Sequence, residues 1–167
     1  MYQRILVPID GSETALKGLD EALQMAKLTG GSVRLIHVVD QLKYVTGFET
    51  FAAYETDLLP ALERAGEQIL QEGRARAESA GVKAETLLFT SLADRVCDLV
   101  VSQARSWKAD LIVIGTHGRR GVSRAMMGSD AEQIVRISPV PVLLVRAVEG
   151  QDKSAAEAVA QPGHAAH

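Results

Sequence analysis

Four short, almost continuous runs of apolar residues have the length of β-strands. They cover residues 5–9, 32–39, 110–114 and 140–145. Apolar runs without regular alternation are typical of strands buried on both faces, as in a parallel sheet covered by helices. A weaker run over residues 83–89 alternates in character, so we expect it at an edge of that sheet.

Between these runs, apolar residues recur at helical spacing, which predicts four amphipathic helices. The order is then β-α-β-α-β-α-β-α-β, and right-handed crossovers give a doubly wound, flavodoxin-like α/β fold, a three-layer sandwich. The predicted core-facing stripes are Leu16, Leu19, Leu23 and Ala26; Leu58, Leu62, Ala65 and Ile69; Val96, Val100, Ala104 and Trp107; and Ala131, Ile134 and Ile137.

Two segments fall outside this alternation. Residues 40–57 are longer than the usual βα connection of about 2–6 residues. They contain Tyr44, Phe48, Phe51 and Tyr54, and are interpreted as a lid over a ligand, a dimer contact or a cover over the core. The C-terminal stretch is polar and Ala-rich, so we expect a folded domain over residues 1–147 and a flexible tail over residues 148–167.

The composition narrows the class of protein. Apolar residues make up 47% of the chain, which favours a packed core and excludes disorder of the whole chain. The sequence has no uncharged apolar run of about 18 residues, so no membrane span is predicted. A single cysteine, Cys97, and an N-terminal apolar run too short for a signal peptide favour the cytoplasm. The net charge of −3 argues against a general nucleic-acid binder.

Residues 115–129 lead from a buried strand into a helix and carry most of the candidate chemistry. Glycines let backbone amides approach an anion, and the N-terminus of a helix adds unpaired amides and a positive dipole end. We therefore interpret the stretch as a phosphate-binding loop, although turn-forming glycines with Ser129 as a helix cap are the alternative. Neither a Walker A loop nor a G-x-G-x-x-G fingerprint is present. The glycines are Gly115, Gly118, Gly121 and Gly128, and the arginines are Arg119, Arg120 and Arg124.

Asp10 follows the first strand directly, within the sequence Pro8-Ile9-Asp10-Gly11-Ser12. Ligands of open α/β sheets bind outside the carboxyl ends of the strands, where the strand order reverses. If the first and fourth strands are neighbours, Asp10 and Gly115 converge there. The carboxylate of Asp10 would then accept hydrogen bonds from a ribose or hold a metal ion through water. The alternative is that Ser12 caps the first helix and Asp10 only shapes the turn.

These residues resemble those of the universal stress proteins in their single-domain form. The resemblance covers about residues 1–147 and centres on the pattern Gly-x2-Gly-x9-Gly-Ser/Thr, which Gly115, Gly118, Gly128 and Ser129 match in every spacing. The first strand with Asp10, the His37-Val38 pair and the last strand with its two prolines also match.

The resemblance implies a five-stranded parallel sheet in the order 3-2-1-4-5, as in the adenine nucleotide alpha hydrolase-like folds. It also implies a homodimer paired through the last strand, from Val140 to Val145, and binding of ATP (or ADP or AMP) with Mg2+ or Mn2+ at the phosphates. By position, Asp10 would contact the ribose and the metal–phosphate region. The remaining implied contacts are Ile9 and Val38 at the adenine, Ile114 just before the loop, and Gly115, Gly118, Gly128 and Ser129 at the ribose and phosphates.

Five further residues complete the candidates. His117 and Arg119 lie within the loop, where His117 either contacts phosphate or is solvated. Asp130 departs from the apolar residue common in the family, so it points away from the phosphates, lowers the affinity or helps to hold Mg2+. His37 is interpreted as a hydrogen-bonded core residue, and Cys97 as an inert thiol.

The predicted function is an ATP-binding stress or regulatory protein with at most weak hydrolysis, because no nucleophile–base pair is evident. The alternative is a nucleotide-free dimeric interaction module. An adenylating enzyme is disfavoured, because no SGGxDS-type loop follows the first strand.

Overall fold

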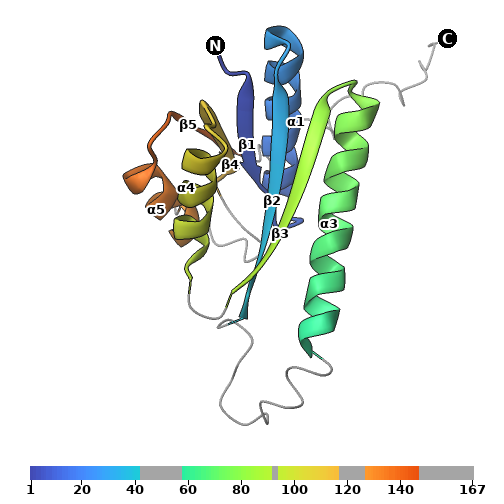
Figure 1. Ribbon diagram of the computed structural model, residues 1–167, viewed down its shortest axis with the longest axis vertical. Helices are drawn as coiled ribbons and strands as arrows, with labels where there is room; N and C mark the ends of the chain where they lie inside the picture. Colours follow the sequence, from blue (N-terminus) through green and yellow to red (C-terminus); the bar gives the residue numbers. More distant parts are fainter. Residues whose placement is uncertain (42–57, 92–93, 117–126, 147–167) are drawn as a thin grey trace, which may run out of the picture.

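The computed structural model describes residues 1–41, 58–91, 94–116 and 127–146. Within these residues, five parallel strands form one sheet in the order β3-β2-β1-β4-β5 (Figure 1). This order confirms the prediction. The strands are β1 (Arg4–Pro8), β2 (Ser32–Asp40), β3 (Lys83–Ser91), β4 (Leu111–Gly115) and β5 (Val142–Val145).

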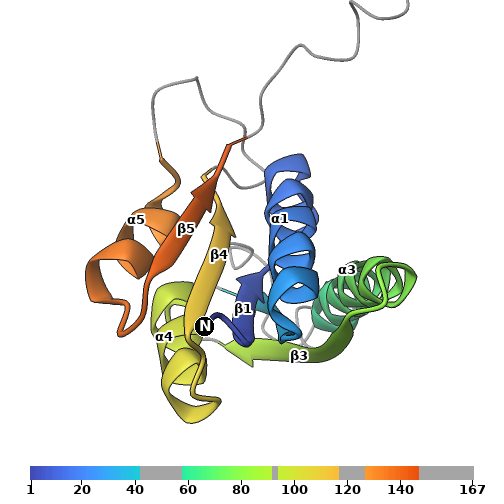
Figure 2. The same ribbon diagram turned by 90° about the horizontal axis from the view of Figure 1, so that it is seen from above.

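Helices cover both faces of the sheet, which confirms the three-layer sandwich (Figure 2). The helices α1 (Glu13–Thr29) and α3 (Leu59–Ser79) lie on one face, and α4 (Val96–Ser106) and α5 (Ser129–Ile137) on the other. None of the helices in the described part of the chain combines the length and apolar character needed to cross a membrane.

The core consists of two aliphatic layers that the sheet separates. Successive residues of a strand point to opposite faces, so Ile5 and Val7 pack with α1 and α3, whereas Leu6 packs with α4 and α5. All three side chains are fully buried. Burial on both faces explains why these strands are continuous apolar runs in the sequence.

The buried face of α3 differs from the predicted stripe. Ala65 is exposed, and the buried residues are Gly66, Leu70, Gly73 and Ala77. The helix packs closely on the sheet because it has glycines there. A Cβ at Gly73 would lie 2.8 Å from Leu35 Cδ1, which is too close for an unshifted contact. The predicted Ile69 does pack against the core, but the prediction missed Gly66 and Gly73 because a glycine has no apolar side chain to count.

The last strand is shorter than predicted, and the buried stripe of the last helix ends earlier than predicted. β5 begins at Val142, and the carbonyl of Pro141 accepts a hydrogen bond from Ile112 N at 3.0 Å. Ile137 is 39% exposed, so the buried stripe of α5 ends at Ile134. β5 is an edge strand, and such strands are commonly short.

β1 lies between β2 and β4, as the convergence of Asp10 and Gly115 requires. Ile5 is opposite Val33 of β2 and Leu111 of β4. The helices that follow β1 and β4 lie on opposite faces of the sheet. The carboxyl ends of β1 and β4 therefore form the switch point at which ligands of such sheets bind.

Candidate functional site

The chain turns sharply where β1 ends. Gly11 adopts a φ of +80°, a left-handed conformation that glycine accepts without strain. Ser12 N donates a hydrogen bond to Asp10 Oδ1 at 2.9 Å, and Ala15 N donates to Ser12 Oγ at 3.2 Å. Ser12 therefore caps α1 and Asp10 shapes the turn, as the alternative reading of this segment expected. The half-buried Asp10 thereby lies beside the N-terminus of α1.

A hydroxyl pair completes this helix N-terminus. Thr14 is 7% exposed, and its Oγ1 lies 3.2 Å from Ser12 Oγ. The sequence analysis did not single out Thr14. The Ser-x-Thr spacing directly after Asp-Gly could have indicated it, because residues at the N-cap and in the first turn lie on one end of the helix.

Gly115 brings the end of β4 against the same helix. A Cβ at this position would lie 2.7 Å from the carbonyl carbon of Thr14 and 2.9 Å from Ala15 N. Only a glycine lets the β4 backbone pass so near the first turn of α1. A glycine is therefore required at position 115 for packing. The same close approach places the start of the loop beside Asp10 and Ser12.

The far end of the loop returns to the same point. Gly128 N donates to Thr116 O at 2.8 Å, and Thr116 N donates to Val145 O at 2.9 Å. Thr116 is only 5% exposed. The hydrogen bonds hold the N-terminus of α5 against the carboxyl end of β4, so two helix N-termini meet at this edge.

Gly128, not Ser129, occupies the N-cap of α5, which contradicts the alternative that Ser129 only caps this helix. Gly128 has φ −60° and ψ 144°, its carbonyl accepts from Glu132 N at 3.0 Å, and no side chain caps the helix. Ser129 is the first helical residue and is exposed. Its hydroxyl therefore stands at the edge of the sheet beside the first amides of α5.

Acidic residues accompany these helix N-termini. Asp130 and Glu132 lie in the first turn of α5, and Glu13 lies in the first turn of α1. Their negative charges stabilise the helices through a favourable interaction with the positive ends of the helix dipoles. Glu132 pairs with Arg136 at 2.9 Å. Asp130 directly follows Ser129 in the sequence.

The apolar candidates divide between the two faces of the sheet. Val38 and Ile114 belong to the layer with α4 and α5. Ile9 is 3% exposed and packs on the side of α1 and α3. The structure therefore brings Val38 and Ile114 to one face and separates the Ile9 side chain from them, which leaves the backbone of Ile9 at the edge.

His37 is a hydrogen-bonded core residue, as expected. It is 7% exposed, and its Nδ1 lies 2.8 Å from Ile9 O. The buried Cys97 lies on α4, where desolvation and the neighbouring Asp98 raise the pKa of its thiol. A thiol with a raised pKa is a weak nucleophile at neutral pH, in line with the predicted inert role.

Several candidates lie outside the described residues: His117, Gly118, Arg119, Arg120, Gly121, Arg124 and the aromatic residues of segment 42–57. The proposed tail, residues 148–167, lies outside them as well. Across the ranges that the structure covers, His, Cys, Asp and Glu side chains form no cluster of three or more that could hold a metal ion.

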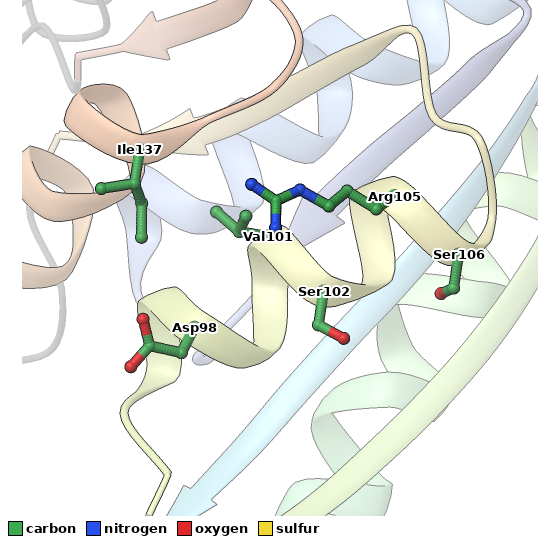
Figure 3. A pocket seen from close by; sticks show the side chains of 6 residues that line it. All are labelled: Asp98, Val101, Ser102, Arg105, Ser106 and Ile137. Atoms are coloured by element: carbon green, nitrogen blue, oxygen red, sulfur yellow. The ribbon is translucent and has the colours of Figure 1, made fainter.

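A surface groove lies elsewhere, along α4. Figure 3 shows the side chains that line it, which come from α4 and from the end of α5. None of the candidate site residues lines this groove, so it is separate from the switch point. The lining residues are Asp98, Val101, Ser102, Arg105, Ser106 and Ile137.

Similar sequences and solved structures are found among the universal stress proteins. The universal stress protein MJ0531 of Methanocaldococcus jannaschii is 33% identical over 146 residues, which cover 87% of this chain and 83% of that protein. The crystal structure of a universal stress protein family member from Burkholderia pseudomallei is 32% identical, with a TM-score of 0.70 over 87% of this chain and 97% of that chain.

Two similar solved structures hold a nucleotide. A universal stress protein in complex with cAMP is 25% identical, with a TM-score of 0.62 over 87% of this chain and 97% of that chain. A further one, from Archaeoglobus fulgidus in complex with dAMP, shares the fold at 24% identity and a TM-score of 0.61, over 86% of this chain and 98% of that chain. The profile of the universal stress protein family matches residues 1–146, and the chain belongs to this family.

Proposed function

We propose that this protein binds an adenine nucleotide, ATP or its ADP or AMP form, at the carboxyl ends of β1 and β4. The observation that carries the proposal is the meeting of two helix N-termini there, fixed by Gly115 against α1 and by the Gly128–Thr116 hydrogen bond. Helix N-termini offer amides and positive dipole ends to phosphates. The relative that was solved with cAMP supports an adenine ligand.

The proposed contacts follow from the faces on which the residues lie. Val38 and Ile114 share the face toward α4 and α5, where an adenine would pack. The backbone amides at Gly115, Gly128 and Ser129 would hold the ribose and phosphates. From outside the described residues, Gly118, His117 and Arg119 would add contacts to the phosphates.

Asp10 is the proposed link to a divalent ion. Mg2+ and Mn2+ bind oxygen ligands and usually keep several waters while they contact one or two carboxylates and the phosphates. The carboxylate of Asp10, with the hydroxyls of Ser12 and Thr14 beside it, fits that donor set. When bound, the ion would neutralise phosphate charge. Asp10 would orient it and the ribose, and Asp130 would either assist the ion or weaken phosphate binding.

The described site contains no arrangement that we assign to catalysis, so we propose a binding protein in which hydrolysis is weak or incidental. It would act as a nucleotide-dependent regulatory module in the cytoplasm, with a folded domain of residues 1–147. Homodimer formation through β5 is part of the proposal. Among the described residues, β5 is the last strand of the sheet, and its Leu144 is 37% exposed.

Thermal unfolding with Mg-ATP tests the proposal. A ligand at 100 times its Kd should raise the free energy of unfolding by about 2.7 kcal/mol. The variant Gly128→Glu should fold, because a φ of −60° suits any residue, yet lose this stabilisation through its bulk and charge. Gln133→Glu adds the same charge on the exposed side of α5 and should keep it. No shift of the wild type at millimolar Mg-ATP would favour the nucleotide-free module instead.

A further inference from the structure

The first carbonyl after β1, that of Ile9, is held by a side chain. The register between β1 and β2 ends with Pro8 opposite Ile36, and Ile9 N still donates to Ile36 O at 2.8 Å. Ile9 O then lies 2.8 Å from Nδ1 of His37, a residue of β2. A carbonyl can only accept, so Nδ1 carries the proton and donates.

This contact determines the orientation of one peptide unit. The peptide bond is planar, so the hydrogen bond to Ile9 O also fixes the plane that contains Asp10 N. The backbone of Asp10 follows directly from this plane. The carboxylate of Asp10 is then set by a second hydrogen bond, from Ser12 N at 2.9 Å. His37 is thus connected to Asp10 through the Ile9–Asp10 peptide unit.

The imidazole is itself fixed from the other side. Its Cδ2 would lie 2.7 Å from a Cβ at Gly66 of α3, and its Nε2 would lie 3.3 Å from it. Gly66 therefore lets α3 pack directly on the ring. His37 is 7% exposed, and its ring is held between the end of β1 and α3, which limits its rotation.

We propose that His37 is a positioning residue of the nucleotide site: its imidazole fixes the Ile9–Asp10 peptide and, through it, the carboxylate that faces the ribose and the metal–phosphate region. The inference rests on the proposed function, because it assigns Asp10 to that site. It explains why a polar side chain occupies an aliphatic layer at this point of β2. His37 would act without touching the nucleotide.

The test compares three variants by calorimetric titration with Mg-ATP. His37→Leu removes the donor and should weaken binding about tenfold, which corresponds to about 1.4 kcal/mol. His37→Asn places an amide nitrogen near the position of Nδ1 and should restore binding to within about threefold. Val33→Ala lies on β2, on the same face and fully buried, but at the other end of the strand, and should lower stability while leaving the affinity unchanged.

Amide NMR shifts of the nucleotide-free protein give a second readout. His37→Leu should move the Asp10 and Gly11 signals, and Val33→Ala should not. If His37→Leu does not fold, Gly66→Ala replaces it, because its Cβ displaces the imidazole and should weaken binding in the same way.

The outcomes separate the two proposals. Wild-type affinity in His37→Leu, or equal loss in Val33→Ala, overturns the role of His37 while nucleotide binding stands. Failure of His37→Asn to restore binding also overturns it. Absence of binding by the wild type overturns the proposed function, and the assignment of His37 with it.

Discussion

Asp10 has two tasks at the end of β1, and they can be separated. Its Oδ1 accepts the hydrogen bond from Ser12 N that shapes the turn. In our proposal, its negative charge attracts the divalent ion. The side-chain oxygen of an asparagine can keep the turn but has no charge. The structural and the electrostatic roles therefore depend on different properties of one side chain.

We expect Asp10→Asn to change the free energy of unfolding by less than about 0.5 kcal/mol, the usual range for a substitution that breaks no special contact. It should weaken Mg-ATP binding about tenfold or more, because the carboxylate no longer attracts the ion. Denaturant titration and calorimetry measure the two effects. Asp20→Asn, on an exposed ion pair with Arg76, is the matched control and should leave binding intact. Equal affinity in both variants would remove Asp10 from the site.

The close packing at Gly115 leads to a separate prediction about the stability of a variant. The Cβ of Gly115→Ala would lie 2.7 Å from the Thr14 carbonyl carbon, so α1 must shift, and overpacking typically costs about 1–3 kcal/mol. Gly18→Ala provides the contrast, because the nearest atom to its Cβ is 3.4 Å away and alanine favours a helix. Urea unfolding of both variants checks this, and equal stability would show that β4 and α1 do not pack as described.

At this scale, the sequence predicted which candidate residues converge at the edge of the sheet but not the orientation of each side chain. Asp10 and Gly115 could be predicted to converge because topology alone brings their strands together. That Ile9 and Val38 lie on opposite faces could not be predicted, because the parity of a side chain depends on where the strand register begins. The N-cap of α5 was similarly shifted by one residue, from Ser129 to Gly128.

Among the elements, hydrophobic spacing predicted every strand and helix that the structure describes, because burial on both faces imposes continuous runs on strands and stripes on helices. The predicted buried face of α3 differs from the observed one for a physical reason. Gly66 and Gly73 pack by lacking a side chain, so their contribution to the core does not register as hydrophobicity. The same feature lets α3 contact His37.

The proposed dimer through the edge strand β5 leads to a prediction about the oligomeric state. If a second copy pairs along β5, Leu144→Arg should convert the protein from a dimer to a monomer, since a charge would be buried at the interface. Leu28→Arg, at a position 88% exposed on α1, is the control and should remain dimeric. Size-exclusion chromatography with light scattering measures both. A wild-type monomer, or a dimer in both variants, would contradict pairing through β5.

As a whole, the molecule consists of a packed scaffold and a chemically distinct edge of the sheet. Two aliphatic layers fix the sheet. The close approach of Gly115 to Thr14 and the Gly128–Thr116 hydrogen bond bring two helix N-termini together at its edge. Membership of the universal stress protein family accounts for the scaffold, whereas the proposed nucleotide binding would depend on the residues at the edge. The groove along α4 is a different surface and serves as an internal reference.

Mapping amide chemical shifts during a titration with Mg-ATP tests the central claim most directly. We expect saturable changes that cluster at residues 9–12, 115–116 and 128–130, with the signals of the residues of the α4 groove unchanged. Changes confined to Asp98, Ser102 and Arg105, or no changes at millimolar Mg-ATP, would contradict a nucleotide site at the carboxyl ends of β1 and β4.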